Sequence, residues 1–218
     1  MNLVWILKKI DGDIMVIDEA TFKEFQIVGK VLTDHRYNTS HSGNISMRSG
    51  GKMLIKRRGA MLGFLESSDI IETDLHQQDS GIMLSSTETE VHRQIFLQTD
   101  AMAVIHAHNP FCVILSLVED EITCLDAEGC YLYKRIPIIE VENPAGPTDA
   151  AKEVPKILKN YPIVVVRTHG VFAKGASLID ALQNVTGAEQ SAMLRYYTLL
   201  LGKPLKRDLS AEKHFSDW

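Results

Sequence analysis

Short apolar runs separated by turn residues mark the beginning of the chain. The runs at residues 3–10 and 13–17 flank Asp11-Gly12, a dipeptide typical of a two-residue β-hairpin turn. We therefore expect a hairpin or edge strand at residues 1–17, as an extension in front of the rest of the chain. Turn residues bound three further predicted strands, at residues 43–48, 52–56 and 69–74.

Apolar residues three and four positions apart mark the helices. Residues 18–37 carry such a stripe, and Thr21 with Glu24 forms a candidate capping box at its start. A second helix is expected after Ser86 or Thr87, because either side chain can accept a hydrogen bond from the free N–H groups of a first turn. Three more helices are expected at residues 110–118, with Pro near its start, 148–160, and 177–201, which Ser177 caps and Gly202 ends.

Strands alternate with helices in the second half of the chain. Short apolar runs at residues 102–106, 136–141 and 163–167 are typical of buried strands. Hairpins followed by strand–helix alternation predict an α/β fold, in which helices cover both faces of a mixed sheet. The 218 residues are 45% hydrophobic, and no linker, repeat or low-complexity run divides them. We therefore expect one domain spanning residues 1–218.

Composition and charge narrow the classes of partner. The formal net charge is −5, so the overall electrostatic field does not favour nucleic acid. The apolar run at residues 1–7 is too short for a signal-peptide core or a membrane span. An odd number of cysteines without a CxxC pair argues against a disulfide framework: Cys112, Cys124 and Cys130. We expect a cytoplasmic protein that binds neither nucleic acid nor membranes.

Three histidines follow apolar runs in a way that suits a metal site. His106 and His108 lie at the end of a predicted strand, where residues two apart point to the same side. His169 follows the apolar run 163–166 and precedes Gly170, which is again a strand end before a turn. A lone histidine at such a place is commonly a polar loop residue, so the prediction depends on all three. Three imidazoles leave one coordination position open, as in a catalytic zinc site.

Several residues near these motifs could hold an anion or move a proton. Glu88 could serve as a fourth ligand or as a proton carrier. Ser86 and Thr87 precede a helix start, which suits phosphate, although both residue types are also ordinary N-caps. Gly43-Asn44 offers a backbone approach and an amide donor, or simply a turn. Arg58-Gly59 offers a cation, or a solvated basic loop. A catalytic metal with several anion donors would suit a phosphorylated sugar.

The motifs and their order resemble the class II aldolase/adducin family. The chain carries Gly-Asn-Ile-Ser at 43–46, Ser-Thr-Glu followed by a histidine at 86–92, His-x-His at 106–108, and His-Gly at 169–170. The resemblance covers roughly residues 18–202. It implies a three-layer α/β/α sandwich with a central mixed, largely antiparallel sheet. It also implies a homotetramer with its sites at subunit interfaces.

The resemblance implies a role for each matched residue. Zn²⁺, or another divalent transition metal, would be bound by His106, His108 and His169, and Glu88 would be the catalytic acid and base. The residues matched to the substrate phosphate are Gly43, Asn44, Ser86 and Thr87. The implied reaction is aldol cleavage of a small ketose phosphate, such as L-fuculose 1-phosphate, to dihydroxyacetone phosphate and an aldehyde.

Two departures from the family pattern keep alternatives open. The segment 56–59, Lys-Arg-Arg-Gly, stands where the aldolases often carry a Thr-Pro-Thr-Gly-like phosphate loop, and the fork of Arg58 suits phosphate or carboxylate. A tyrosine used by an aldolase of the family is also absent at the matched segment 125–129, with Tyr131 and Tyr133 close by. The alternatives are an epimerase, a dehydratase or a decarboxylase, or a non-catalytic adducin-like scaffold. Scaffold relatives tend to lose the metal residues, whereas this chain keeps them.

Overall fold

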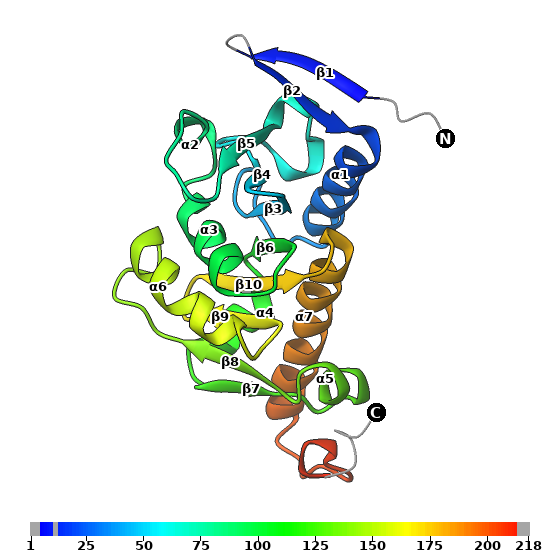
Figure 1. The fold of residues 1–218 in the computed structure, drawn as a ribbon. Helices are drawn as coiled ribbons and strands as arrows, with labels where there is room; N and C mark the ends of the chain where they lie inside the picture. The colour runs from blue at the N-terminus through cyan, green and yellow to red at the C-terminus, as the bar shows by residue number, and fades with distance from the viewer. Residues whose placement is uncertain (1–4, 11–12, 213–218) are drawn as a thin grey trace.

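A mixed eight-stranded sheet forms the centre of the computed structural model, which describes residues 5–10 and 13–212 (Figure 1). Its strands are β3 (Asn44–Ser49), β4 (Lys52–Lys56), β5 (Ile70–Asp74), β6 (Ala103–Ala107), β7 (Glu121–Thr123), β8 (Arg135–Ile139), β9 (Ile163–Val166) and β10 (Gly170–Gly175). They lie in the order β5-β4-β3-β6-β10-β9-β8-β7. Among these described strands only β8 and β9 pair in parallel, so the sheet is largely antiparallel, as expected.

Helices cover both faces of this sheet. The main helices are α1 (Glu19–Asp34), α3 (Thr89–Gln98), α4 (Pro110–Ser116), α6 (Pro147–Leu158) and α7 (Leu178–Leu201). One apolar cluster joins α1, α4 and α7 to one face of the sheet, and a second joins α3 and α6 to the other. Val104 and Ile105 are neighbours in β6 but belong to different clusters, because successive strand residues point to opposite faces. The three-layer α/β/α sandwich is therefore confirmed.

Smaller elements complete the fold. They are α2 (Gly81–Leu84), α5 (Ala127–Leu132) and three 3₁₀ turns at Leu62–Phe64, Ser67–Asp69 and Leu209–Ala211. At the N-terminus, β1 (Trp5–Ile10) pairs antiparallel with β2 (Asp13–Asp18), and this hairpin extends beyond the central sheet. Its predicted turn, Asp11-Gly12, lies outside the described residues. Within the described part of the chain, no helix is long and apolar enough to span a membrane.

The helix predicted from residue 18 starts there, but its predicted capping box is wrong, and so is the predicted start of the helix after Ser86 or Thr87. Helix α1 is capped by Asp18, whose carboxylate accepts from the backbone N–H of Thr21 at 2.9 Å, so the capping box of Thr21 with Glu24 does not form. Helix α3 begins at Thr89, with Glu88 rather than Ser86 or Thr87 at its N-cap position. The reason is a pairing with β4: the backbone N–H of Ser86 donates to the carbonyl of Lys56 at 3.1 Å. That pairing holds the segment extended, and the helix starts only after it.

Strand β10 is not predicted by the sequence pattern, although it lies near the middle of the sheet. It pairs with β6 on one side and with β9 on the other. Its apolar core, residues 171–173, is short and lies between Gly170 and Gly175, so the segment looks like a turn in the sequence. The short elements β7 and α5 are also not predicted. Strand β10 is important for the site, because the turn between β9 and β10 carries His169.

Candidate metal centre and active site

One end of the sheet gathers the residues that the sequence singled out. Strand β6 delivers His106 near its end, and Asn44, the first residue of β3, lies opposite His106 in the strand register. The turn between β9 and β10 brings His169 to the same place. The start of α3 adds Glu88. Residues that are far apart in sequence therefore meet at one point because the strands are antiparallel and in this register.

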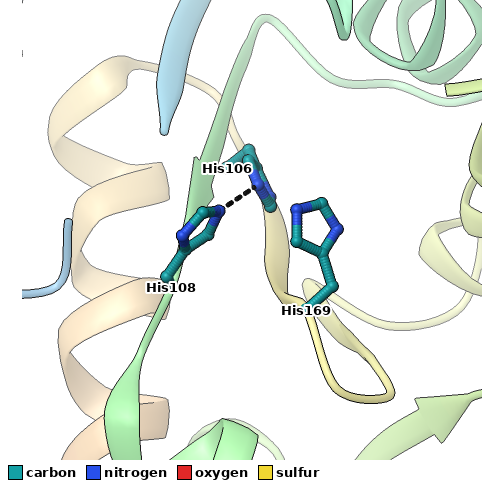
Figure 2. A group of neighbouring side chains, drawn as sticks. All are labelled: His106, His108 and His169. Carbon is teal, nitrogen blue, oxygen red and sulfur yellow. Dashed lines mark hydrogen bonds between the residues drawn. The ribbon is translucent and has the colours of Figure 1, made fainter. Parts of the chain in front are cut away.

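The three histidine rings face one another (Figure 2). Their centroids are separated by 4.9 Å for His106 and His108, 4.7 Å for His106 and His169, and 5.0 Å for His108 and His169. His108 lies one residue beyond the end of β6, and its Nε2 is 3.0 Å from Nε2 of His106. The predicted same-side placement of His106 and His108 is confirmed.

The ring of His106 is held in one tautomer. Its Nδ1 lies 2.9 Å from the carbonyl oxygen of Val171, and a carbonyl can only accept, so Nδ1 carries the hydrogen. The lone pair of the neutral ring is then on Nε2, which faces the other two histidines. Phe172 stacks on the same ring with a centroid distance of 4.3 Å, and behind it lies the buried His92, bonded to Ser46. His92 thus packs behind Phe172 and does not belong to the histidine group.

The histidine group fits a transition metal. One nitrogen from each ring lies within 4.8 Å of those from the others. Two nitrogens bound to the same tetrahedral Zn²⁺ at ~2.1 Å are roughly 3.4 Å apart, close to the 3.0 Å between His106 and His108. Burial lowers the pKa of all three histidines, to about 4 for His108. The rings are thus neutral at pH 7, which is the form that coordinates metals.

The turn that carries His169 is tied to the end of α4. Thr168 has a φ of 67°, and its backbone N–H donates to the hydroxyl of Ser116 at 3.1 Å. Arg167 donates to the carbonyl oxygens of Ser116 and Glu119. After this turn, a Cβ on Gly170 would press against the carbonyl oxygen of Ala107 and lie 3.0 Å from the ring of His108. A glycine is needed there for β10 to start against β6.

Glu88 lies directly against the histidine group. Its Oε2 is 3.2 Å from Nε2 of His106, and its Oε1 is 4.0 Å from Nε2 of His169. The same Oε2 accepts a hydrogen bond from the amide of Asn44 at 2.7 Å. Burial raises the pKa of Glu88 to about 7, while the Asn44 hydrogen bond and the charge of Lys56 act in the opposite direction. The carboxyl group is therefore oriented toward the metal position and largely shielded from water.

A cavity of about 250 Å³ opens beside this group. It is lined by all six anion-site candidates: Gly43, Asn44, Arg58, Gly59, Ser86 and Thr87. Glu88, His108 and His169 also line it, and the fully buried His106 lies behind them. Asn44 and Ser86 are buried, whereas Arg58 and Thr87 are exposed. The structure thus brings every site residue named from the sequence to one cavity or its wall.

Two of these residues have an unexpected local role. Gly43 has a φ of +72°, and a Cβ at this position would meet the side chain of Asn38 at 2.5 Å. The amide of Asn44, expected as a phosphate donor, already donates to Glu88, and its Oδ1 is buried without a partner among the described residues. Asn44 therefore orients the carboxylate of Glu88 as well as lining the cavity.

Sequence reasoning missed four further lining residues: His41, Ser42, Lys56 and Ala145. Lys56 is the notable one, because it is a cation with only 3% of its surface exposed. In the sequence it forms a basic run with Arg57 and Arg58, and such a run is usually solvated. The signal that could have found it is its place at the end of β4, directly after the buried residues 53–55.

The comparisons with known proteins agree with this geometry. The model of the class II aldolase and adducin N-terminal domain matches residues 23–196. The L-fuculose phosphate aldolase of Methanocaldococcus jannaschii is 32% identical over 184 residues, covering 83% of this chain and 98% of the relative. The crystal structure of L-fuculose-1-phosphate aldolase from Thermus thermophilus matches with a TM-score of 0.78 and 30% identity, over 86% of this chain and 98% of that one.

A relative with a different activity is also similar. The methylthioribulose-1-phosphate dehydratase of Gluconobacter oxydans is 28% identical over 179 residues, covering 74% of this chain and 84% of the relative. The family therefore includes enzymes that cleave and enzymes that dehydrate sugar phosphates. The match to the family model spans the whole eight-stranded sheet, most of both helical layers and all the histidines of the site. On these grounds, the chain belongs to the class II aldolase/adducin family.

Proposed function

We propose that this protein is a zinc-dependent aldolase that cleaves a small ketose phosphate, such as L-fuculose 1-phosphate, into dihydroxyacetone phosphate and an aldehyde. One observation carries the proposal: three neutral imidazoles, one carboxylate and six candidate anion donors converge on one cavity. The L-fuculose phosphate aldolases among the relatives support this choice of substrate.

The protein groups have separate tasks in this reaction. His106, His108 and His169 would hold the metal, which when bound supplies Lewis acidity to polarise the ketone and to stabilise developing negative charge. Cleavage of the C3–C4 bond leaves its electron pair as an enediolate, while the C4 hydroxyl gives its proton to the solvent water of the open cavity and becomes the aldehyde. Glu88 delivers a proton to the enediolate carbon. It is the one acidic side chain among the described residues that line the cavity.

The remaining lining residues position the substrate. We assign the phosphate to the backbone and side-chain donors of Gly43, Asn44, Arg58, Gly59, Ser86 and Thr87. A bound phosphate fixes the position of the reacting carbons relative to the catalytic groups. This positioning lowers the entropic cost of reaching the transition state. Gly59, with a φ of 76° and no atom within 4 Å of where a Cβ would be, leaves its backbone open to such a ligand.

A screen of ketose phosphates with zinc-loaded protein tests the proposal. Released dihydroxyacetone phosphate is measured with a coupled reductase, and we expect a signal with L-fuculose 1-phosphate or a close analogue. The second candidate is a dehydratase, which the Gluconobacter oxydans relative favours. A dehydratase would consume the substrate and keep all its carbons in one product. An epimerase or a decarboxylase would likewise consume it without releasing dihydroxyacetone phosphate.

Replacing Arg58 by alanine is expected to weaken the binding of phosphorylated substrates. A lost hydrogen bond to a charged group costs about 1.5–3 kcal/mol, so KM should rise roughly ten- to a hundredfold, with kcat little changed. Unphosphorylated analogues should be affected much less. KM and kcat for both kinds of substrate, measured on the wild type and the variant, check this.

Arg57→Ala is the matched control for Arg58. Arg57 is also exposed but does not line the cavity, so its loss should leave KM unchanged. An equal effect of Arg58→Ala on both kinds of substrate, or no effect, would make Arg58 a solvated loop residue. If a carboxylated substrate proves best and depends on Arg58, the decarboxylase alternative replaces the aldolase.

The proposed function also includes an oligomeric state and a cellular compartment. We propose a single-domain protein that assembles into a homotetramer in the cytoplasm, with sites at subunit interfaces. Apolar side chains such as Val118, 78% exposed, and Leu201, 69% exposed, support contacts between copies near the ends of α4 and α7. The free and buried cysteines suit a reducing compartment.

A further inference from the structure

A buried carboxylate on α7 holds the start of α4. Oε1 of Glu189 accepts a hydrogen bond from the backbone N–H of Phe111 at 2.9 Å, and its Oε2 accepts from that of Cys112 at 3.1 Å. These N–H groups belong to the first turn of α4, where a helix offers them no partner of its own. Glu189 is only 5% exposed and forms no ion pair with another described residue. A carboxylate in such a place is costly, and an apolar side chain would join the two helices at a lower cost.

The start of α4 lies directly after a histidine of the metal group. Asn109 alone separates His108 from the first residue of α4. Asn109 is fully buried, and its side-chain amide donates to the carbonyl oxygen of Val185 on α7 at 2.9 Å. His108 itself lies beyond the end of β6, so the pairing of that strand does not fix it alone. The contacts with Val185 and Glu189 hold the segment that follows this histidine.

The other end of α4 is tied to α7 as well. Arg195 donates through Nε and Nη2 to the two carboxylate oxygens of Glu119, at 2.6 and 2.9 Å. Such a two-point contact fixes the direction of both side chains. The carbonyl oxygen of Glu119 accepts from Arg167 at 3.1 Å. Arg167 and Thr168 lead directly into His169, so the pair of Arg195 and Glu119 reaches the turn that carries this histidine.

We propose that Glu189 and Arg195 are positioning residues of the metal site, and that both act through α4. Glu189 sets the position of His108, and Arg195 sets that of His169. His106 needs no such support, because it lies within β6. Groups that orient a metal ligand contribute about 10–100-fold to metal affinity. The inference rests on the metal site of the proposed function.

The competing role for the two residues is purely structural. Each joins α7 to α4 or to the segment after it, and losing such a contact lowers the free energy of unfolding. A structural role predicts a less stable protein whose folded form binds the metal as the wild type does. A positioning role predicts weaker metal binding by a protein that is still folded. The two roles therefore differ in the metal affinity of the folded state.

Competition with a coloured chelator at pH 7 measures the Zn²⁺ affinity of the folded protein. We expect Glu189→Gln to weaken Zn²⁺ binding roughly ten- to a hundredfold, because glutamine offers one acceptor oxygen to two N–H groups. Asp126→Asn is the matched control. Asp126 likewise accepts from a backbone N–H at a helix start, that of Gly129 in α5, and α5 carries no residue of the site. This variant should bind Zn²⁺ like the wild type.

Arg195→Met tests the other end of α4 and covers the case in which Glu189→Gln does not fold. Arg195 is partly exposed, so the loss of its ion pair disturbs the fold less. Zn²⁺ affinity should again fall by roughly tenfold or more. Glu119→Gln should lower the affinity to a similar extent. The double variant should lose little more than either single variant, because both changes remove the same contact.

The absorption bands of bound Co²⁺ give a second readout, because they depend on the geometry of the ligands. They should change in Glu189→Gln and in Arg195→Met but not in Asp126→Asn. Wild-type Zn²⁺ affinity in either folded α7 variant, or an equal loss in Asp126→Asn, overturns the proposal. Absence of metal binding by the wild type would overturn the metal site and the proposed function as well. No measurement needs turnover, so a failure to find a cleaved ketose phosphate would not be confused with failure of the positioning role.

Discussion

Replacing His106 by alanine is expected to empty the metal site and to lower turnover by more than about a hundredfold. Loss of a partner that merely orients a ligand already costs ~10–100-fold in metal affinity, and loss of a ligand costs more. His106 is fully buried, with its Nδ1 fixed by Val171 and its Nε2 directed at the other two histidines, so its replacement removes a ligand that the fold holds in place. Elemental analysis of protein purified without chelator measures the effect, against an expected value of about one metal ion per chain.

Two further variants make this result specific. His169→Ala should also lose the metal, because it removes a ring from the same group. His41→Ala should keep it, since His41 lines the cavity but does not belong to the group. Full metal occupancy in both His106→Ala and His169→Ala would contradict the assignment of the metal site.

Replacing Glu88 by glutamine is expected to reduce turnover by roughly a hundredfold or more while the fold and the metal content are retained. Glutamine has the same shape and can still accept the hydrogen bond from Asn44, but it cannot take up and release a proton. Metal content and circular dichroism should be measured on the same preparation. Those measurements separate a lost proton carrier from a lost ligand.

Glu90→Gln is the control for the second prediction. Glu90 lies in the first turn of the same helix, but its carboxylate pairs with Arg93 and lies outside the cavity lining. Its replacement should leave turnover close to the wild-type value. If Glu88→Gln were as active as the wild type, Glu88 would be reduced to an acidic residue that suits the helix N-terminus.

The parts of the fold that the sequence predicts are those with an uninterrupted pattern. Strands β6 and β9 are apolar throughout most of their length, and the stripe in α1 is regular, so local reasoning finds them. Strand β10 has three apolar residues between two glycines and becomes a strand only because β6 and β9 pair with it on either side. The start of α3 is likewise decided by the contact of Ser86 with Lys56, which no local pattern contains.

The same distinction applies to the site. The placement of His106 and His108 follows from the period of a strand, and His169 follows from its place before a turn. The role of Asn44 depends on the pairing of β3 with β6, which places Asn44 opposite His106. Its hydrogen bond to Glu88 depends on where α3 starts. In the sequence Lys56 belongs to a basic run that is expected to be exposed. In the structure its Nζ donates to the carbonyl oxygen of Gly43, a contact that only the folded chain makes. The roles of Asn44 and Lys56 could not be predicted from the sequence because they depend on contacts between strands that are distant in the chain.

The way His106 is held has a consequence for handling the protein. Its ring is fixed by a backbone carbonyl, and the surrounding sheet is held by apolar packing on both faces rather than by ligand bonds. In small zinc domains the ion supplies the folding energy, whereas here we expect the packed core to keep its fold without the proposed metal. Chelation should therefore be reversible. We therefore expect the proposed site to take up a spectroscopically visible ion, such as Co²⁺, without a refolding step.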